Sequence, residues 1–327
     1  MMKFKSAFNQ EINDYLALRE HTVSHGTYKC DCVTLHSFDD YLAANGICNK
    51  EISSKDVYGW MQLLHPAYAR STVVGKVSNL RKFLEYLRHV GFSVFLPDCP
   101  KLRDTYMPYI FSDDELDKIF RAADSIQMTK NSIPHIQLEI PMLLRLLYCC
   151  GLRVNEALTI RIKDIHFEND AILIRNAKNK KQRIVPIGGE LTDMLKKYCL
   201  SIDLSGSPEN FLFPGRVPEK HMSENTAMRR FKAILKETDI YIEPVPHTRG
   251  QCLHCFRHLF AIRSFAQAER NGRLTDDSVP YLSLYLGHDD MNGTEKYLKF
   301  SSDMFPEYND LFESYAGDVF SEVSYEE

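Results

Sequence analysis

His254-Cys255-Phe256-Arg257-His258-Leu259-Phe260-Ala261 combines titratable and charged side chains with a run of apolar ones. The pattern predicts a helix, and His254 and Arg257, three residues apart at its start, then share one face. A single phosphate group would contact both side chains, and Leu259-Phe260-Ala261 supplies the apolar face that buries the helix. An earlier segment, Pro246-His247-Thr248-Arg249-Gly250, has glycine where the paired arginine would stand. We therefore favour His254 and Arg257 as the functional pair.

A second basic residue lies upstream, in Gly151-Leu152-Arg153-Val154-Asn155-Glu156. The apolar run Ile140–Cys150 predicts a buried helix, and Gly151 suits its C-terminal cap. Arg153 would then be fixed at a helix junction. Its planar guanidinium, like that of Arg257, matches the geometry of a phosphate and neutralises charge on its oxygens. A surface arginine is the alternative that the residue alone leaves open.

The third part of the pattern is Leu286-Gly287-His288, followed nine residues later by Tyr297. His288 follows a glycine at a predicted helix end, where it would bond a phosphate oxygen. Tyr297 is the candidate nucleophile. A free phenol has a pKa of roughly 10, so neighbouring cations must help it ionise. The chain has 17 tyrosines, and only the distance from His288 distinguishes this one.

Three lysines gather in the segment 176–182, between the β-prone runs Ala171–Arg175 and Arg183–Ile187. This arrangement predicts a small hairpin with a basic turn. A lysine on such a turn would reach a bound phosphodiester and act as general acid for a leaving oxygen. The residues themselves do not separate this role from that of an exposed basic turn.

In order and local spacing, this set resembles the active site of the tyrosine recombinase (phage integrase) family. The resemblance covers about Tyr109 to Tyr297 with specific motifs and the N-terminal part more loosely. The six matching positions are Arg153, Lys181, His254, Arg257, His288 and Tyr297. The family's register selects Lys181, while Lys178 and Lys180 remain alternatives because Ala177 and Asn179 replace the family's usual glycines. By the same resemblance, Glu156 orients Arg153, and His254 acts as acid or base or binds phosphate.

The resemblance implies a mainly α fold with a small β-sheet or hairpin, arranged as a two-domain, C-shaped clamp on DNA. It implies a site-specific recombinase that cleaves and rejoins DNA through a 3′-phosphotyrosyl intermediate and a Holliday junction. The expected partners are double-stranded DNA with paired recombination sites, a homotetramer on synapsed DNA, and a directionality or accessory factor. No cofactor or metal is expected. Added residues around Asp124 to Leu138 and the altered lysine turn favour a mobile-element enzyme.

A length of 327 residues predicts two domains. Prolines 97, 100 and 108 interrupt helical periodicity over Leu96–Pro108, which we interpret as an interdomain linker. We expect a helical core-type DNA-binding domain over 1–105, a catalytic domain over 106–300 and an acidic tail over 301–327 that exchanges between protomers. The other predicted helices are Gln10–Glu20, His36–Ala44, Thr72–Val90 capped by Ser71, one capped by Ser112 and Glu115, Ser223–Glu237, Cys255–Gln267 and Val279–Leu286.

The net charge of −4 is unevenly distributed. Residues 302–327 hold 8 acidic and no basic side chains, so the preceding 301 residues have 40 Lys and Arg against 36 Asp and Glu. A mildly basic body fits a polyanionic partner, because neutralised phosphates release condensed counterions. The residues expected to contact DNA are Lys76, Arg81, Lys82, Lys178 and Lys180.

Cellular location is predicted from absent signals. No apolar run approaches the roughly 20 residues of a membrane span, and the N-terminus lacks a signal peptide. We expect a cytoplasmic protein without membrane contact that is nucleoid-associated when bound to DNA. Nine cysteines do not form a secreted disulfide pattern. Cys252 and Cys255 form a C-x-x-C without the second pair that a zinc site needs.

Two other classes of function are compatible with parts of this pattern. A type IB topoisomerase-like or telomere-resolving enzyme would use the same nucleophile, and relaxation of a plasmid lacking recombination sites would identify the former. A catalytically inactive architectural DNA-binding protein would bind without forming an adduct. The complete set of six residues favours the active recombinase.

Overall fold

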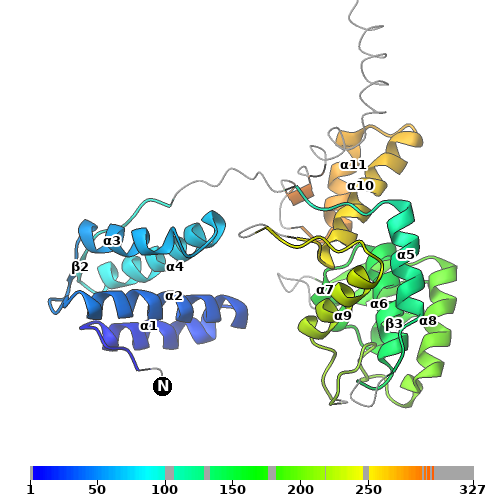
Figure 1. Ribbon diagram of the computed structural model, residues 1–327, viewed down its shortest axis with the longest axis horizontal. Helices are drawn as coiled ribbons and strands as arrows, with labels where there is room; N and C mark the ends of the chain where they lie inside the picture. Colours follow the sequence, from blue (N-terminus) through cyan, green and yellow to red (C-terminus); the bar gives the residue numbers. More distant parts are fainter. Residues whose placement is uncertain are drawn as a thin grey trace, which may run out of the picture. The chain divides into compact units, whose positions relative to one another are not determined.

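The computed structural model describes residues 3–99, 107–128, 133–175, 182–217, 219–245 and 250–288, together with Met291, Gly293, Thr294 and Tyr297. The described residues form two compact units, one made by 3–99 and the other by those from Met107 onward. Each unit is mainly helical and has its own hydrophobic core (Figure 1). The predicted fold class, mainly α with a small sheet, is confirmed. No helix within the described ranges is long and apolar enough to cross a membrane.

The N-terminal unit packs helices around aromatic side chains. Its elements are α1 (Asn9–Thr22), α2 (His25–Ala44), α3 (Ser54–Leu64), α4 (Arg70–His89) and the short parallel pair β1 (Glu51–Ile52) and β2 (Ser93–Val94). Trp60, Phe38 and Phe83 are fully buried in its core. The apolar residues of α4, Val73, Val77, Leu80, Leu84 and Leu87, are also buried, so this face holds the helix in the unit.

α2 begins at His25 rather than at the predicted His36. Ser24 caps it by accepting a hydrogen bond from the Thr27 amide. Asp31, in the first half of α2, is buried and accepts a hydrogen bond from Arg19 of α1 at 2.8 Å. Because a charged pair occupies part of the buried face, the apolar periodicity that would reveal the helix is interrupted.

The predicted cap of α4 was wrong. The helix begins at Arg70, which places Ser71 in its first turn, and Ala69 at the N-cap position makes no side-chain hydrogen bond. α3 was not predicted, although Ser53 and Asp56 form a capping box at its start.

In the second unit, helices surround the apolar helix α6 (Ile136–Cys150), which packs against α5, α8, α9 and α10 (Figure 1). The elements around it are α5 (Asp113–Asp124), α7 (Val154–Leu158), α8 (Gly189–Ser201), α9 (Glu224–Glu237), α10 (His254–Arg270), α11 (Thr275–Leu286) and the 3₁₀ turns Ile162–Asp164 and Leu204–Gly206. Both predicted helix ends here are confirmed. Ser112 and Glu115 form a capping box on α5, and Gly151 ends α6 at φ 57°.

Gly151 is required at this position for two reasons. Its positive φ is costly for other residues, and a Cβ there would lie 2.5 Å from the Phe260 side chain on α10. The end of α6 therefore lies directly against α10, and Arg153 follows two residues later.

A small antiparallel sheet completes the second unit. Its strand order is β3 (Ile165–His166), β4 (Ala171–Ile174) and β5 (Arg183–Pro186), and Ile174 pairs with Arg183 at the turn end of the predicted hairpin. β3 was not predicted because two residues are too few to show an alternating pattern. The turn carrying Lys178, Lys180 and Lys181 lies outside the described residues.

Candidate active site

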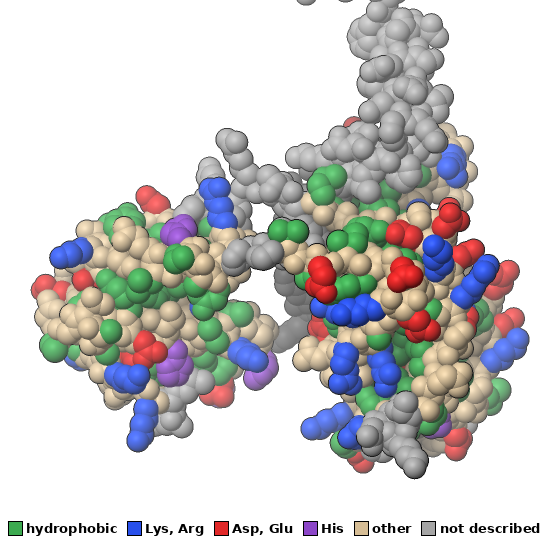
Figure 2. Space-filling view, viewed as in Figure 1, with side chains coloured by type: hydrophobic (Ala, Val, Ile, Leu, Met, Phe, Trp, Pro, Cys, Tyr) green, Lys and Arg blue, Asp and Glu red, His purple; other side chains and the backbone are tan. Residues whose placement is uncertain are grey.

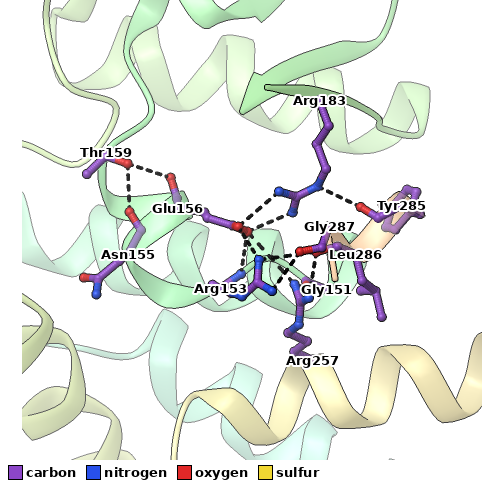
Figure 3. Close-up of polar contacts among 10 residues, drawn as sticks. All are labelled: Gly151, Arg153, Asn155, Glu156, Thr159, Arg183, Arg257, Tyr285, Leu286 and Gly287. Atoms are coloured by element: carbon purple, nitrogen blue, oxygen red, sulfur yellow. Dashed lines mark hydrogen bonds and ion pairs between the residues drawn. The ribbon is translucent and has the colours of Figure 1, made fainter. Parts of the chain in front are cut away.

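The Glu156 carboxylate lies at the centre of three arginines (Figure 3). Arg153, at the N-cap of α7, donates to it from its backbone amide at 3.0 Å and from Nη1 at 2.8 Å. Arg183, the first residue of β5, donates from Nη1 to Oε1 at 3.0 Å and from Nη2 to Oε2 at 2.8 Å. Arg257 Nη1 lies 4.0 Å from Oε2. One carboxylate thus joins segments that are far apart in the sequence.

Glu156 is ionised under all ordinary conditions. Its side chain is 2% exposed, and this burial alone would favour the neutral acid. The hydrogen bonds and charge of Arg183, with the hydrogen bonds of Arg153, outweigh burial and lower the pKa to about 2. The carboxylate is therefore a fixed negative charge that holds the arginines together.

Arg257 is the most deeply buried of the three arginines, at 1% exposed. It donates to the Gly151 carbonyl at 2.9 Å and to the Leu286 carbonyl at 2.7 Å. Burial and the charge of Arg153 lower its pKa to about 10, which still leaves it protonated at neutral pH. It connects the end of α6 to the end of α11.

All three arginines also converge on the C-terminus of α11. Its last carbonyls have no partners within the helix and carry the negative end of the helix dipole. The Tyr285 carbonyl accepts from Arg183 Nε at 2.7 Å, and the Gly287 carbonyl accepts from Arg153 Nη2 at 2.9 Å (Figure 3). Gly287, at φ 66°, ends the helix and places His288 directly beside this cluster.

The Tyr297 side chain is 4% exposed. Burial raises the pKa of its phenol, while the charge of Arg257, a side-chain hydrogen bond to Arg257 and the charge of Arg153 oppose the rise. Its ring centroid lies 5.5 Å from that of His258 and 6.3 Å from that of His288. His288 Nδ1 is 2.6 Å from the Thr294 hydroxyl, which fixes the imidazole.

Five of the six predicted site residues lie in one region of the second unit. Arg153, Arg257 and Tyr297 are in contact or share partners, His288 stacks beside Tyr297, and the His254 ring lies 4.7 Å from that of His258. The sixth, Lys181, with its alternatives Lys178 and Lys180, lies outside the described residues. The predicted support of Arg153 by Glu156 corresponds to a hydrogen-bonded ion pair.

Two residues of this region were missed from the sequence. Arg183 was treated only as part of a strand, although it follows the lysine turn. His258 is four residues after His254, so the two share a helix face, and this spacing was a signal that could have been used.

The predicted DNA contacts of the N-terminal unit differ in exposure. Lys76 is 7% exposed, with its ammonium 4.8 Å from the centre of the Tyr68 ring, and this placement does not support it as a phosphate contact. Arg81 is partly exposed and pairs with Glu85 at 3.0 Å. Lys82 is exposed.

Cys252 and Cys255, which bracket His254 in the sequence, have their sulfur atoms 3.9 Å apart. No group of three His, Cys, Asp or Glu side chains suited to a metal occurs in the described part of the chain.

The profile of the phage integrase family matches residues 110–303, more than half of the sequence. This chain belongs to the phage integrase family. A tyrosine recombinase of Pseudothermotoga lettingae is 28% identical over 300 residues, covering 88% of this chain and 92% of that protein. The tyrosine recombinase XerD of Haemophilus influenzae is 23% identical and covers 95% of this chain and 99% of its own length.

Solved structures of this phage integrase family fold are also similar to the chain. The site-specific recombinase XerH, bound to a palindromic difH substrate after cleavage, has a TM-score of 0.69 at 18% identity and covers 88% of this chain and 80% of its own. The Tn1549 transposon integrase in complex with transposon right-end DNA has a TM-score of 0.64 at 16% identity, covering 90% and 94%. These likenesses establish the fold, and the arginine cluster belongs to the matched region.

Proposed function

We propose that this chain is a site-specific DNA recombinase that cleaves and rejoins DNA through Tyr297. The observation that carries the proposal is the burial of the Tyr297 phenol beside buried Arg257, within a cluster where Glu156 also holds Arg153. A nucleophile is thereby held beside cations suited to phosphate. The tyrosine recombinases among its relatives support the same activity.

In the proposed reaction, the Tyr297 oxygen attacks phosphorus. A bond from this oxygen to phosphorus forms, the bond from phosphorus to the 5′ oxygen breaks, and a 3′-phosphotyrosyl link and a 5′ hydroxyl result. We assign His258 as the base that takes the phenolic proton, because its ring lies 5.5 Å from that of Tyr297, with His254 beside it. Lys181 gives a proton to the leaving oxygen. Attack by a partner strand's 5′ hydroxyl reverses these steps without ATP.

Arg153 is the arginine best placed to reach a phosphate. Its side chain is 24% exposed, whereas Arg257 is buried. Contacts with other described residues use three of its five N–H groups, two on Nη1 and one on Nη2. The remaining two are suited to a non-bridging oxygen, where charge develops during the attack.

DNA is the proposed partner, and a basic surface on the second unit supports it. A depression of about 460 Å³ is lined by Arg216, Lys220, His221, Arg229 and Arg230, and by no Asp or Glu among the described residues. Figure 2 shows Lys and Arg side chains gathered over the part of this unit that carries α9 and the preceding loop. A surface of one charge suits a polyanion, with an affinity that falls with salt. Lys82 is a further proposed phosphate contact.

The proposed biological setting is a mobile element. A probable integrase/recombinase of Acholeplasma phage L2 is 27% identical over 233 residues, and the Tn1549 integrase shares the fold. We propose that four protomers act on two paired sites through a Holliday junction, with an accessory factor setting direction. The acidic segment 301–327 is the proposed contact between protomers.

The test uses a suicide substrate, a nicked duplex carrying the element's end located by footprinting. We expect wild type to form an SDS-resistant protein–DNA adduct. Tyr297→Phe should bind the duplex equally and form none. Tyr281→Phe is the matched control, because this tyrosine on α11 is 67% exposed, and it should behave as wild type. Tight binding without an adduct from wild type would overturn the proposal and favour an architectural DNA-binding protein.

A further inference from the structure

Arg183 has no role in the reaction proposed above, yet its side chain bonds protein groups through all three of its guanidinium nitrogens. Both Nη atoms bond the Glu156 carboxylate, and Nε bonds the Tyr285 carbonyl (Figure 3). Only 11% of its side chain is exposed. A guanidinium used in this way on three sides acts on protein groups rather than on a phosphate.

The two parallel hydrogen bonds from Arg183 fix the orientation of the Glu156 carboxylate. A bidentate arginine–carboxylate pair defines the plane and rotation of both groups. Without it, Glu156 would be hydrogen-bonded by Arg153 alone, three residues before it, with Arg257 at the longer distance of 4.0 Å. Because Arg153 donates to the same two oxygens, a rotation of the carboxylate would move its guanidinium as well.

The same side chain also supports the turn that carries His288. A Cβ on Gly287 would lie 3.1 Å from Arg183 Nη1 and 3.3 Å from Cζ, so the guanidinium packs directly against this backbone. Together with the bond to the Tyr285 carbonyl, this contact holds the last turn of α11 from one side. Arg153 and Arg257 hold it from the others.

We propose that Arg183 is a positioning residue for strand cleavage: through Glu156 it sets the direction of Arg153, and through Tyr285 and Gly287 it sets the turn before His288. This inference rests on the proposed recombinase function. A misplacement of about 1 Å in a reacting group lowers rates by about 100-fold. The loss should therefore fall on the cleavage rate of bound DNA and leave DNA affinity unchanged.

The experiment measures single-turnover cleavage of the suicide substrate at saturating DNA by full-length Arg183→Lys and Arg183→Gln. The lysine variant keeps the charge, but a single ammonium group cannot form the hydrogen bonds to the Glu156 carboxylate and to the Tyr285 carbonyl that the planar guanidinium forms. We expect both variants to cleave about 100-fold more slowly, with unchanged DNA affinity. The control is Arg175→Gln, at the other strand of the hairpin, where Arg175 pairs with buried Asp164. It removes another arginine that pairs with a buried carboxylate and should keep the wild-type rate.

A second substrate separates positioning from a loss of stability. Replacing one non-bridging oxygen of the scissile phosphate by methyl removes the charge that Arg153 neutralises. The cleavage rates of wild type and Arg183→Lys are compared on both substrates, each rate expressed per folded, DNA-bound molecule. If Arg183 acts through Arg153, the ratio of the wild-type rate to the Arg183→Lys rate should be at least about tenfold smaller on the methylphosphonate than on the phosphate. Equal deficits on both substrates, or a wild-type rate for Arg183→Lys, would overturn the inference. Absence of an adduct from wild type would instead refute the proposed function.

Discussion

Replacing Glu139 with glutamine should stabilise the second unit, and more so as pH rises. Glu139 lies on α6 with 0% exposure, and neither carboxylate oxygen has a hydrogen-bond partner among the described residues. Burial raises the pKa of this carboxyl from 4.5 to about 8. Between these values the folded protein keeps a proton that the unfolded chain has released, so the free energy of unfolding falls with rising pH. Below pH 4.5 and above pH 8 the effect is constant.

The magnitude follows from the width of this interval. Within this interval, each pH unit changes the free energy of unfolding by about 1.4 kcal/mol. Between about pH 5 and about pH 8, the wild type should therefore lose about 4 kcal/mol of stability that Glu139→Gln does not lose. At pH 5 both side chains are neutral and the two proteins should be similar in stability. The free-energy cost of a buried polar group without a hydrogen-bond partner is present in both proteins, so it cancels when their stabilities are compared.

The assay is urea unfolding of both proteins at several pH values, followed by circular dichroism and tryptophan fluorescence. Trp60 is the single tryptophan of the chain and lies in the N-terminal unit. Its fluorescence transition should be the same in both proteins, while the remaining circular dichroism transition shifts. A stability difference that does not change with pH would refute the reasoning, because it would mean that Glu139 does not titrate in this range.

Three further substitutions test the cluster and the basic surface. Glu156→Gln should lose about 3 kcal/mol of stability at neutral pH, because the pKa of Glu156 is lowered to about 2 in the folded protein. This stabilisation is fully present above pH 4.5 and declines toward pH 2. Unfolding of both proteins at two pH values measures it. Gly287→Ala should destabilise more than Gly272→Ala, because both have positive φ but only Gly287 packs against another side chain; equal losses would exclude the packing effect. Arg229→Ala should weaken DNA binding and reduce the salt slope by about 1, measured by titration at increasing salt.

Sequence predicted those parts of the fold that depend on neighbouring residues. The capping box of Ser112 and Glu115 and the end of α6 at Gly151 are local signals, and the structure confirms both. The grouping of Arg257 with Tyr297 came from spacing along the chain and from the family resemblance. The first two features can be recognised within a short window of residues, whereas the grouping of Arg257 with Tyr297 depended on the family resemblance.

What sequence could not predict depends on contacts between distant segments. Arg183 meets Glu156 across 27 positions and Tyr285 across 102, so no local pattern marks it as part of the site. Lys76 shows the opposite difficulty. It lies three residues after Val73 and four before Leu80, so it shares the helix face of these buried residues and is itself buried. Its charge suggested an exposed position that its helical phase does not provide.

The hydrogen bonds that hold the arginine cluster join residues far apart in the sequence, and this has a consequence for the cell that makes the protein. The bonds that fix Arg153 and Arg257 reach across 134 and 106 positions of the chain. Such distant contacts form late, because closing long loops costs entropy before any contact compensates for it. A nascent or partly unfolded chain therefore has no assembled cluster beside Tyr297. The ability to break DNA should appear only with the completed fold, which protects the genome from an enzyme that is still folding.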